Sequence, residues 1–416
     1  MTQPFDAAIV GGGFSGLWTA YHLIQSEPTL RIAIFERNQV GSGASGRNGG
    51  WASALYPISD TNLLKKVSQE SIEGLHSQLE ISIDEIGAIA QKLNINIGFA
   101  KGGSLTVARN RGQLIRLESE ATSPLLSASQ TRERIKMRDA VAAVFTPHCA
   151  ALNPAALVVG LAQFLVERGV EIFENSEAYI SKDDLLFVGG RKIATKFVVR
   201  ATEAYQEGTR NQIPIYSLMI ASDPLPSHVL EAIGVENRET FAEATHLVTY
   251  AQRTADERLV IGGRGASYSL GSRRKDSNEK RVKDHDRLRS MARSWFPVLK
   301  EVNFPYSWGG AVGVTRDWAP YVRSRPAFAE MGGYAGDGVT LSYLCAGATA
   351  DLILQRESAR TSLPFMQWQN PKWEPEPLRW IGVNAGIKLS AWADREENRY
   401  QRPSTLMRTF STILGR

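Results

Sequence analysis

The sequence has few cysteines, no long hydrophobic run and no internal repeat. Its two cysteines, Cys149 and Cys345, stand far apart in 416 residues, which matches neither a disulfide framework nor a zinc site. No apolar stretch approaches the roughly 20 residues of a membrane-spanning helix. The first apolar run starts within about five residues of Met1, which leaves no room for a signal peptide. These absences favour a cytoplasmic protein.

Charge of one sign is not concentrated either. The net charge is +5, with 43% hydrophobic and 22% charged residues, as in ordinary globular proteins. The basic stretch at 273–283 is interleaved with acids and has no aromatic residues, so we expect no nucleic acid partner. The six histidines show no pairing or ligand spacing, and we expect no metal site.

The N-terminal segment carries a dinucleotide-binding pattern. An apolar run at 7–10 predicts a strand, and the sequence Gly-Gly-Gly-Phe-Ser-Gly at 11–16 leads into an apolar helix. A second apolar run at 30–35 ends on Glu36, at the spacing of about 20 residues that this pattern requires. Strand, tight turn, helix, strand and acid are therefore all in register.

Each part of this pattern has a chemical reason. Gly11 forms the tight turn, Gly13 lets the backbone approach a pyrophosphate, and Gly16 lets the helix lie close to the strand. The helix N-terminus faces the phosphates, while Glu36 accepts hydrogen bonds from ribose hydroxyl groups.

The rest of the chain alternates between helical and strand patterns. Apolar periodicity predicts helices at 64–93, 111–121, 154–168, 283–295 and 339–354. Strands are expected at 98–100, 104–108, 170–173, 197–201, 215–221, 246–251, 259–262 and 304–308, with a hairpin at 185–192. The β-rich part from 214 to 310 predicts a separate sheet that lies over the cofactor.

Three further motifs that contain glycine follow the N-terminal pattern along the chain. They are Gly-Ala-Ser-Gly-Arg-Asn-Gly-Gly at 43–50, Trp-Gly-Gly at 308–310 followed by Thr-Arg-Asp at 315–317, and Gly-Tyr-Ala-Gly-Asp-Gly-Val at 333–339. With the N-terminal pattern, in this order, the sequence resembles the D-amino-acid oxidase superfamily of flavoproteins. Within it, the motifs are most similar to the gamma-glutamylputrescine oxidase branch.

This resemblance implies a fold and a division of the chain. The expected fold is α/β with α+β: a discontinuous Rossmann-type FAD-binding domain, a β-sheet-rich substrate domain and a C-terminal extension. The FAD-binding domain would comprise residues 1–95, 146–212 and 309–360, the substrate domain 96–145 and 213–308, and the extension 361–416.

The resemblance also implies FAD as cofactor, and residues that hold it. These are Gly11, Gly13, Ser15, Gly16, Glu36, Arg37, Ser45, Arg47, Asn48, Gly49, Ala178, Gly336, Asp337, Gly338, Val339 and Thr340. Arg37 and Ala178 would lie along the adenine, and backbone N–H groups of 336–340 would face the flavin O2. The FAD is expected to be non-covalent, because residues 309–312 contain no cysteine and Cys345 lies within an apolar helix.

Two arginines in these motifs have alternative interpretations. Arg47 stands among glycines with no acid nearby in the sequence, which favours a flavin or phosphate partner over solvent exposure or an ion pair. Arg316 is a candidate for substrate binding, or forms a local ion pair with Asp317.

The resemblance implies oxidation of an amine by hydride transfer to the flavin. We assign no general base, and Arg47, Asn48 and Trp308 would only position the reactants. Glycine oxidase-like members hold the substrate carboxylate with an arginine where this chain has Val312, so a primary or secondary amine is expected rather than an α-amino acid.

Other residues would shape the substrate site. Arg264 is a candidate contact for a distant anionic group, or a structural arginine at a turn. Tyr250, Trp308 and Trp318 are candidate walls of an apolar slot, or ordinary core residues.

Molecular oxygen is the expected electron acceptor, but alternatives stand beside it. One is an amino-acid oxidase of the glycine or sarcosine oxidase type. Another is a flavin dehydrogenase that passes electrons to a quinone or carrier, held peripherally at the inner membrane face by the tryptophan- and arginine-rich tail with its basic, apolar segment at 408–414. A non-enzymatic FAD-binding module is a third.

Overall fold

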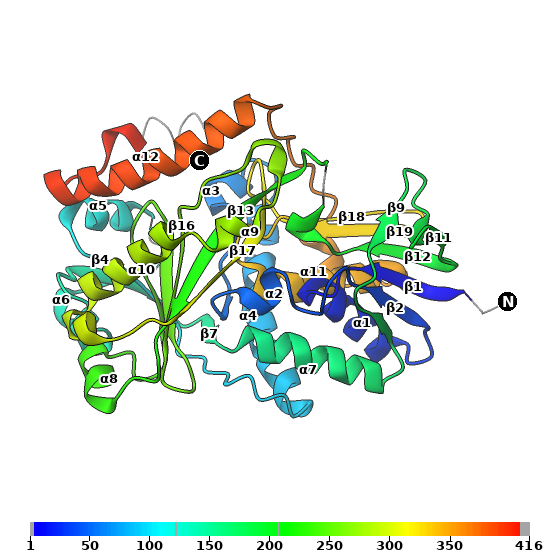
Figure 1. The fold of residues 1–416 in the computed structure, drawn as a ribbon, viewed down its shortest axis with the longest axis horizontal. Helices are drawn as coiled ribbons and strands as arrows, with labels where there is room; N and C mark the ends of the chain where they lie inside the picture. Colours follow the sequence, from blue (N-terminus) through cyan, green and yellow to red (C-terminus); the bar gives the residue numbers. More distant parts are fainter. Residues whose placement is uncertain (1–3, 121–122, 207, 408–416) are drawn as a thin grey trace.

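The first apolar run forms the central strand of a six-stranded sheet in the computed structural model, which describes residues 4–120, 123–206 and 208–407. The strand order is β18 (Tyr321–Arg325), β19 (Phe328–Gly332), β12 (Thr195–Arg200), β1 (Phe5–Val10), β2 (Ile32–Phe35) and β8 (Glu171–Phe173). All neighbours are parallel except β18 and β19. This sheet lies on the right in Figure 1.

Both faces of this sheet are covered, as its continuous apolar strands require. Ala7 and Ile9 point into one core with α1 (Phe14–Ser26), α4 (Gln69–Lys92), α7 (Pro154–Glu167) and α11 (Gly338–Ile353). Ala8 and Val10 point to the other face, because side chains alternate along a strand. A small sheet of β9 (Ala178–Ile180), β10 (Leu186–Val188) and β11 (Arg191–Lys192) covers that face.

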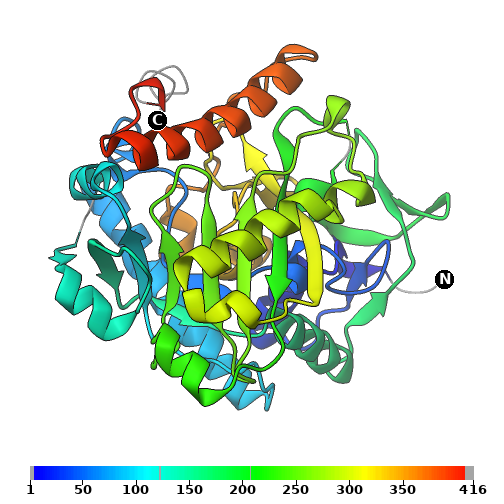
Figure 2. The same ribbon diagram turned by 60° about the vertical axis from the view of Figure 1, so that its left-hand side comes forward.

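A second sheet has eight strands. Its order is β17 (Tyr306–Thr315), β13 (Gln212–Ala221), β16 (Leu259–Arg264), β15 (Thr249–Arg253), β14 (Thr240–Glu243), β4 (Ser104–Ala108), β6 (Ala142–Thr146) and β5 (Leu125–Leu126). Helix α10 (Val282–Trp295) lies across one face of it, in front of the strands in Figure 2. The sheet also borders α5 (Arg111–Glu120) and α6 (Ala128–Arg134), and α8 (Ser227–Ile233) contributes to the same core.

Short elements and the C-terminal helix complete the fold. They are α2 (Ala44–Arg47), β3 (Trp51–Ser53) paired with β7 (Cys149–Ala151), α3 (Asp60–Leu63) and α9 (Asp276–Glu279). Helix α12 (Leu378–Tyr400) packs on α5 beside the second sheet, far from β1 (Figure 1).

Several expected elements are confirmed in detail. Helix α7 begins at the expected cap, where Asn153 Oδ1 accepts a hydrogen bond from Ala156 N at 3.1 Å, and α10 matches the expected helix at 283–295. Cys345 is fully buried in the core, as its apolar helix predicts. No helix in the described ranges is long and apolar enough to cross a membrane.

Three expectations were wrong. Residues 98–100 form no strand, only a single bridge between Ala100 and Ala151. The expected helix at 64–93 begins only at Gln69, because Ser68 caps it by accepting from Ser71 N. The boundary expected between 308 and 309 falls inside β17, which pairs with β13 along its whole length.

Candidate functional site

A hollow opens at the carboxyl ends of the parallel strands, where ligands bind in sheets of this type. It contains about 1180 Å³ of space between atoms, including its mouth. Eleven of the residues expected to bind the cofactor line it, namely Gly11, Gly13, Ser15, Glu36, Arg37, Ser45, Asn48, Ala178, Gly336, Gly338 and Val339. Gly16, Arg47, Gly49, Asp337 and Thr340 lie outside this lining.

The first glycine turn requires glycine for two physical reasons. Gly11 has a φ of +114°, and a Cβ there would stand 2.5 Å from Ala201 O, so any other residue would be strained and would clash. A Cβ at Gly16 would stand 2.0 Å from Gly11 O. Gly16 therefore does not line the hollow, but it allows α1 to pack closely against the turn that follows β1.

Glu36 is held in place by the backbone around it. Its Oε2 accepts from Gly12 N and its Oε1 from Asn38 N, both at 2.8 Å. Each carboxylate oxygen has a further lone pair, which can accept from a ribose hydroxyl. Beside it, Arg37 forms a long ion pair with Glu177, at 3.7 Å, and both residues line the hollow.

Helix α2 forms a second wall of the hollow. Ser45 Oγ accepts from Phe14 N at 2.9 Å, which ties α2 to the start of α1. The Asn48 amide donates to Ser45 O at 2.7 Å and its Oδ1 accepts from Gly50 N at 2.8 Å. Asn48 therefore shapes this loop with its own side chain while it lines the hollow.

The expectation that Arg47 has no acid nearby was wrong. Its Nη1 donates to Glu279 Oε2 at 2.8 Å, across 232 residues of sequence. Glu279 belongs to α9, and burial raises the pKa of its carboxyl while Arg47 opposes this rise. The pair therefore joins the cofactor side of the molecule to the second sheet, a contact that distance along the chain concealed.

The second glycine turn leads into α11. Gly336 has a φ of +113°, and Asp337 stands at the N-cap of the helix. Burial raises the pKa of Asp337 to about 7, against the effect of Arg264. Thr340, 1% exposed, has no hydrogen-bond partner for its Oγ1 among the described residues.

The residues present fit the FAD that the resemblance implies. A glycine cradle, a helix N-terminus and an oriented carboxylate provide for a pyrophosphate and a ribose. At the other end of the hollow, Gly338 and Val339 of the α11 N-terminus belong to the lining, and the first N–H groups of a helix have no partner within it; the Thr340 hydroxyl stands in the same turn, behind the lining. Buried polar groups normally have partners, so this end suits a polar ring edge.

Side chains of the second sheet alternate between α10 and the cofactor side. Ile261 and Leu218 pack towards α10, whereas Tyr250 stands over Gly49, where a Cβ would approach its ring to 2.3 Å. Trp308 Nε1 donates to Arg47 O at 2.9 Å, on the same side as Tyr250. These two predicted substrate-site residues therefore lie on one face, next to the α2 loop.

Arg264 lies on this face as well. Its guanidinium donates to Ala335 O and stacks on the Trp318 ring with 5.0 Å to the centroid. Burial lowers the pKa of Arg264, while Asp337 opposes this effect. The structure therefore places Arg264 beside the second glycine turn, and its role as a contact for a distant anionic group stays a prediction.

Arg316 is directed elsewhere. Its Nε donates to Glu374 at 2.9 Å, and its guanidinium lies over Trp373 of the C-terminal extension. Asp317 accepts instead from Trp368 Nε1 at 2.9 Å, so the local Arg316–Asp317 pair is not formed. We do not retain Arg316 as a substrate-binding residue.

The sequence analysis missed Glu203, Tyr205 and Tyr334, which also line the hollow. Glu203 stands three residues after the end of β12, a strand parallel to β1. The carboxyl ends of parallel strands gather at one edge, so the position of Glu203 after a predicted strand was the available signal.

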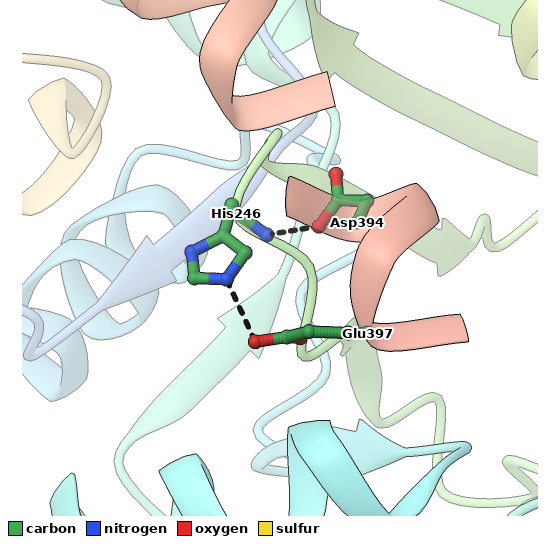
Figure 3. Close-up of side chains that lie close together, drawn as sticks. All are labelled: His246, Asp394 and Glu397. Carbon is green, nitrogen blue, oxygen red and sulfur yellow. Dashed lines mark hydrogen bonds and ion pairs between the residues drawn. The ribbon is translucent and has the colours of Figure 1, made fainter. Parts of the chain in front are cut away.

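His246, Asp394 and Glu397 bring potential metal-ligand atoms within 4.8 Å of one another (Figure 3). The expectation that the histidines lack pairing was wrong here, because His246 Nε2 lies 2.8 Å from Glu397 Oε1. Asp394 accepts from the backbone N–H groups of His246 and Leu247, and Arg116 donates to both oxygens of Glu397. We therefore interpret these interactions as a structural contact, called the α12 contact below, that holds α12 against α5 and the loop before β15.

Comparison with known proteins agrees with this geometry. The family model described as "DAO: FAD dependent oxidoreductase" matches residues 6–352. The chain is 26% identical to the gamma-glutamylputrescine oxidoreductase of Escherichia coli over 381 residues, covering 86% of both chains. It is 25% identical to the sarcosine oxidase subunit beta of Rhizobium meliloti, covering 77% of both. The crystal structure of glycine oxidase from Geobacillus kaustophilus superposes with a TM-score of 0.74 at 22% identity, covering 88% of this chain and 99% of that one.

Proposed function

Because the chain belongs to the DAO family of FAD-dependent oxidoreductases, we propose that it oxidises the C–N bond of a primary or secondary amine. The neutral amine loses a hydride from carbon and a proton from nitrogen to become an imine, which water hydrolyses to an aldehyde or ketone and to ammonia or an amine. When bound, FAD supplies the hydride acceptor. Molecular oxygen is the proposed final electron acceptor, and the FAD is proposed to be non-covalent.

The residues of the chain would bind and orient the reactants. Glu36 and the turn at 11–16 would hold the adenosine and pyrophosphate portions, and the N-terminus of α11 would face the pyrimidine edge of the ring. Trp308 and Tyr250, on the face of the second sheet that contacts the α2 loop, would form walls that exclude water from the substrate. Arg264 would attract an anionic group on the substrate, away from the oxidised carbon.

The observation that carries the choice of an amine is Val312. Val312 lines the hollow at the position where the resemblance places an α-carboxylate-binding arginine. An apolar side chain there cannot form the charge-assisted hydrogen bonds that a carboxylate needs. An amine without an α-carboxylate therefore fits this wall better than glycine or sarcosine does.

The test is an anaerobic titration of the purified holoenzyme with a panel of amines and amino acids. Loss of the visible flavin absorbance with alkylamines or polyamines, and its persistence with α-amino acids, would support the proposal. Bleaching by glycine, sarcosine or D-amino acids would instead assign the second candidate, an amino-acid oxidase. No bleaching by any amine would contradict both.

The acceptor needs a separate experiment. With a substrate that bleaches the flavin, oxygen consumption is compared with the reduction of a quinone dye. Faster dye reduction would favour a dehydrogenase that serves a quinone at a membrane surface. The tail segment 408–414, on which that alternative rests, lies outside the described residues.

A further inference from the structure

Glu203 is a carboxyl in the cofactor hollow that the proposed reaction does not use. It begins a short turn after β12 with a φ of +44°, a strained conformation for a residue with a side chain. Its Oε2 accepts from Ala204 N at 2.6 Å and from Gly313 N at 2.7 Å. These bonds join the end of the first sheet to β17 of the second.

All of these partners are neutral. The backbone N–H groups of Gly333 and Tyr334 also favour its carboxylate form, but they are dipoles rather than charges. Asp337, the other carboxyl near the α11 turn, differs because Arg264 opposes its negative charge. In the described part of the chain, the groups that favour a charge on Glu203 are these backbone N–H groups, whereas Arg274, Arg47 and Glu279 act on Tyr205 of the same turn.

The surroundings of Glu203 favour a proton on its carboxyl. A Cβ built at Gly313 would stand 2.6 Å from Glu203 Oε1 and 2.8 Å from Gln212 Oε1, so both oxygens border the same point. Gln212 Oε1 is buried without a hydrogen-bond partner in the described ranges. A proton on the Glu203 carboxyl would place a donor near this acceptor.

The titratable groups that face Glu203 do not compete for this proton. They are the phenols of Tyr205 on its own turn, Tyr321 on β18 and Tyr334 after β19. Burial raises the pKa of each phenol, to about 12 for Tyr205, so all three are neutral near pH 7. Burial raises the pKa of Glu203 to about 7, against the backbone hydrogen bonds, so Glu203 changes charge in the neutral range.

We propose that Glu203 is the proton-holding residue of the FAD site, and that its carboxyl takes up one proton when the enzyme accepts two electrons. This inference rests on the proposed function. A hydride brings two electrons and one proton, and so adds one negative charge to the hollow. Since charges interact strongly in a low-dielectric site, Glu203 then binds a proton from solvent and restores the charge balance.

The same proton has a use in the oxidative half-reaction. Oxygen takes up two electrons and two protons to become hydrogen peroxide. One proton returns with the hydride, and Glu203 donates the second. The carboxylate is thereby regenerated, and the cycle is balanced in charge and protons.

The test is the reduction potential of the holoenzyme flavin between pH 6 and 9, in wild type and in Glu203→Gln. Above pH 7, the reduction potential of wild type is expected to fall by about 30 mV per pH unit more than that of Glu203→Gln. For two electrons, this difference means that the equilibrium constant for reduction falls tenfold more per pH unit in wild type. Parallel curves would overturn the inference. A protein that carries no FAD, or one that no amine reduces, would count against the proposed function instead.

Two variants make the result specific. Asp337→Asn removes the other carboxyl with a pKa raised to about 7, and it is expected to keep the steeper slope above pH 7. Loss of that slope in Asp337→Asn alone would assign the proton to Asp337 and refute the role of Glu203. If Glu203→Gln fails to fold, Glu203→Asp replaces it, and an unchanged midpoint of the pH dependence would contradict the inference.

Discussion

Replacing Glu397 by Gln tests whether the contact between α12 and the second sheet contributes to stability. The Glu397 side chain is fully buried, with Arg116 at 3.1 Å and His246 at 2.8 Å. Burial raises the pKa of Glu397, but the hydrogen bonds from His246 and Arg116 outweigh this effect, and the pKa falls from 4.5 to about 2. A difference of roughly 2.5 units corresponds to about 3 kcal/mol of stability at neutral pH, on the order of the cost of breaking a buried ion pair.

The sign of the pH dependence follows from the direction of this shift. The carboxylate is stabilised in the folded protein, so its contribution is present above pH 4.5 and is lost as the pH falls towards 2. For a large domain, about 3 kcal/mol corresponds to a decrease in Tm of roughly 6–12 °C. Circular dichroism melting of the holoenzyme at pH 7, and at steps from pH 5 to 3, measures both effects.

The exposed Glu236 provides a control, since Glu236→Gln removes a carboxylate without a buried partner and is expected to melt like wild type. A Glu397→Gln variant that melts within about 1 °C of wild type at pH 7 would refute a stabilising role for the α12 contact, because a difference that small corresponds to well under 1 kcal/mol. A difference that persists unchanged down to pH 3 would refute the assignment of the effect to the Glu397 charge.

Other changes test the cofactor and substrate sites. Glu36→Gln is expected to weaken FAD binding about 10–100-fold, as for a lost charge-assisted hydrogen bond; equal FAD dissociation constants, measured by flavin fluorescence, would contradict the ribose role. Val312→Arg is expected to raise kcat/KM for glycine relative to that for an alkylamine by at least about tenfold. If oxygen-consumption assays show the same ratio of these two kcat/KM values as in wild type, the hypothesis that Val312 replaces a carboxylate-binding arginine is contradicted. Glu279→Gln is expected to speed FAD release only a few-fold, because Arg47 is 40% exposed and such pairs contribute about 1 kcal/mol or less; a release rate equal to wild type would show that the pair does not hold α2.

The geometry of the first glycine turn was predictable because it is local. Gly11 and Gly16 are required by a backbone turn that spans only a few residues, and Glu36 follows at the end of the next strand. Hydrophobic periodicity similarly predicted α7 and α10, since a helix that buries one face shows its period in the sequence.

The interactions that join distant segments were not predictable in this way. Arg47 reaches Glu279 across 232 residues, and Glu397 reaches His246 across 151. Each pairing depends on how the two sheets and α12 pack together, which no local pattern specifies. The sequence therefore favoured a flavin or phosphate partner for Arg47, although the folded chain brings the acid Glu279 next to it.

Electrostatic properties depend on the tertiary structure even more strongly. In the sequence, Glu203 is one glutamate after a strand, like many others. Only burial and the neutral N–H groups around it bring its pKa to about 7, because the free energy of a charge depends on all the dipoles and solvent that surround it. The sequence by itself determined the glycine turn, the helix and the acid of the dinucleotide-binding pattern; the tertiary structure decided which charges face the hollow.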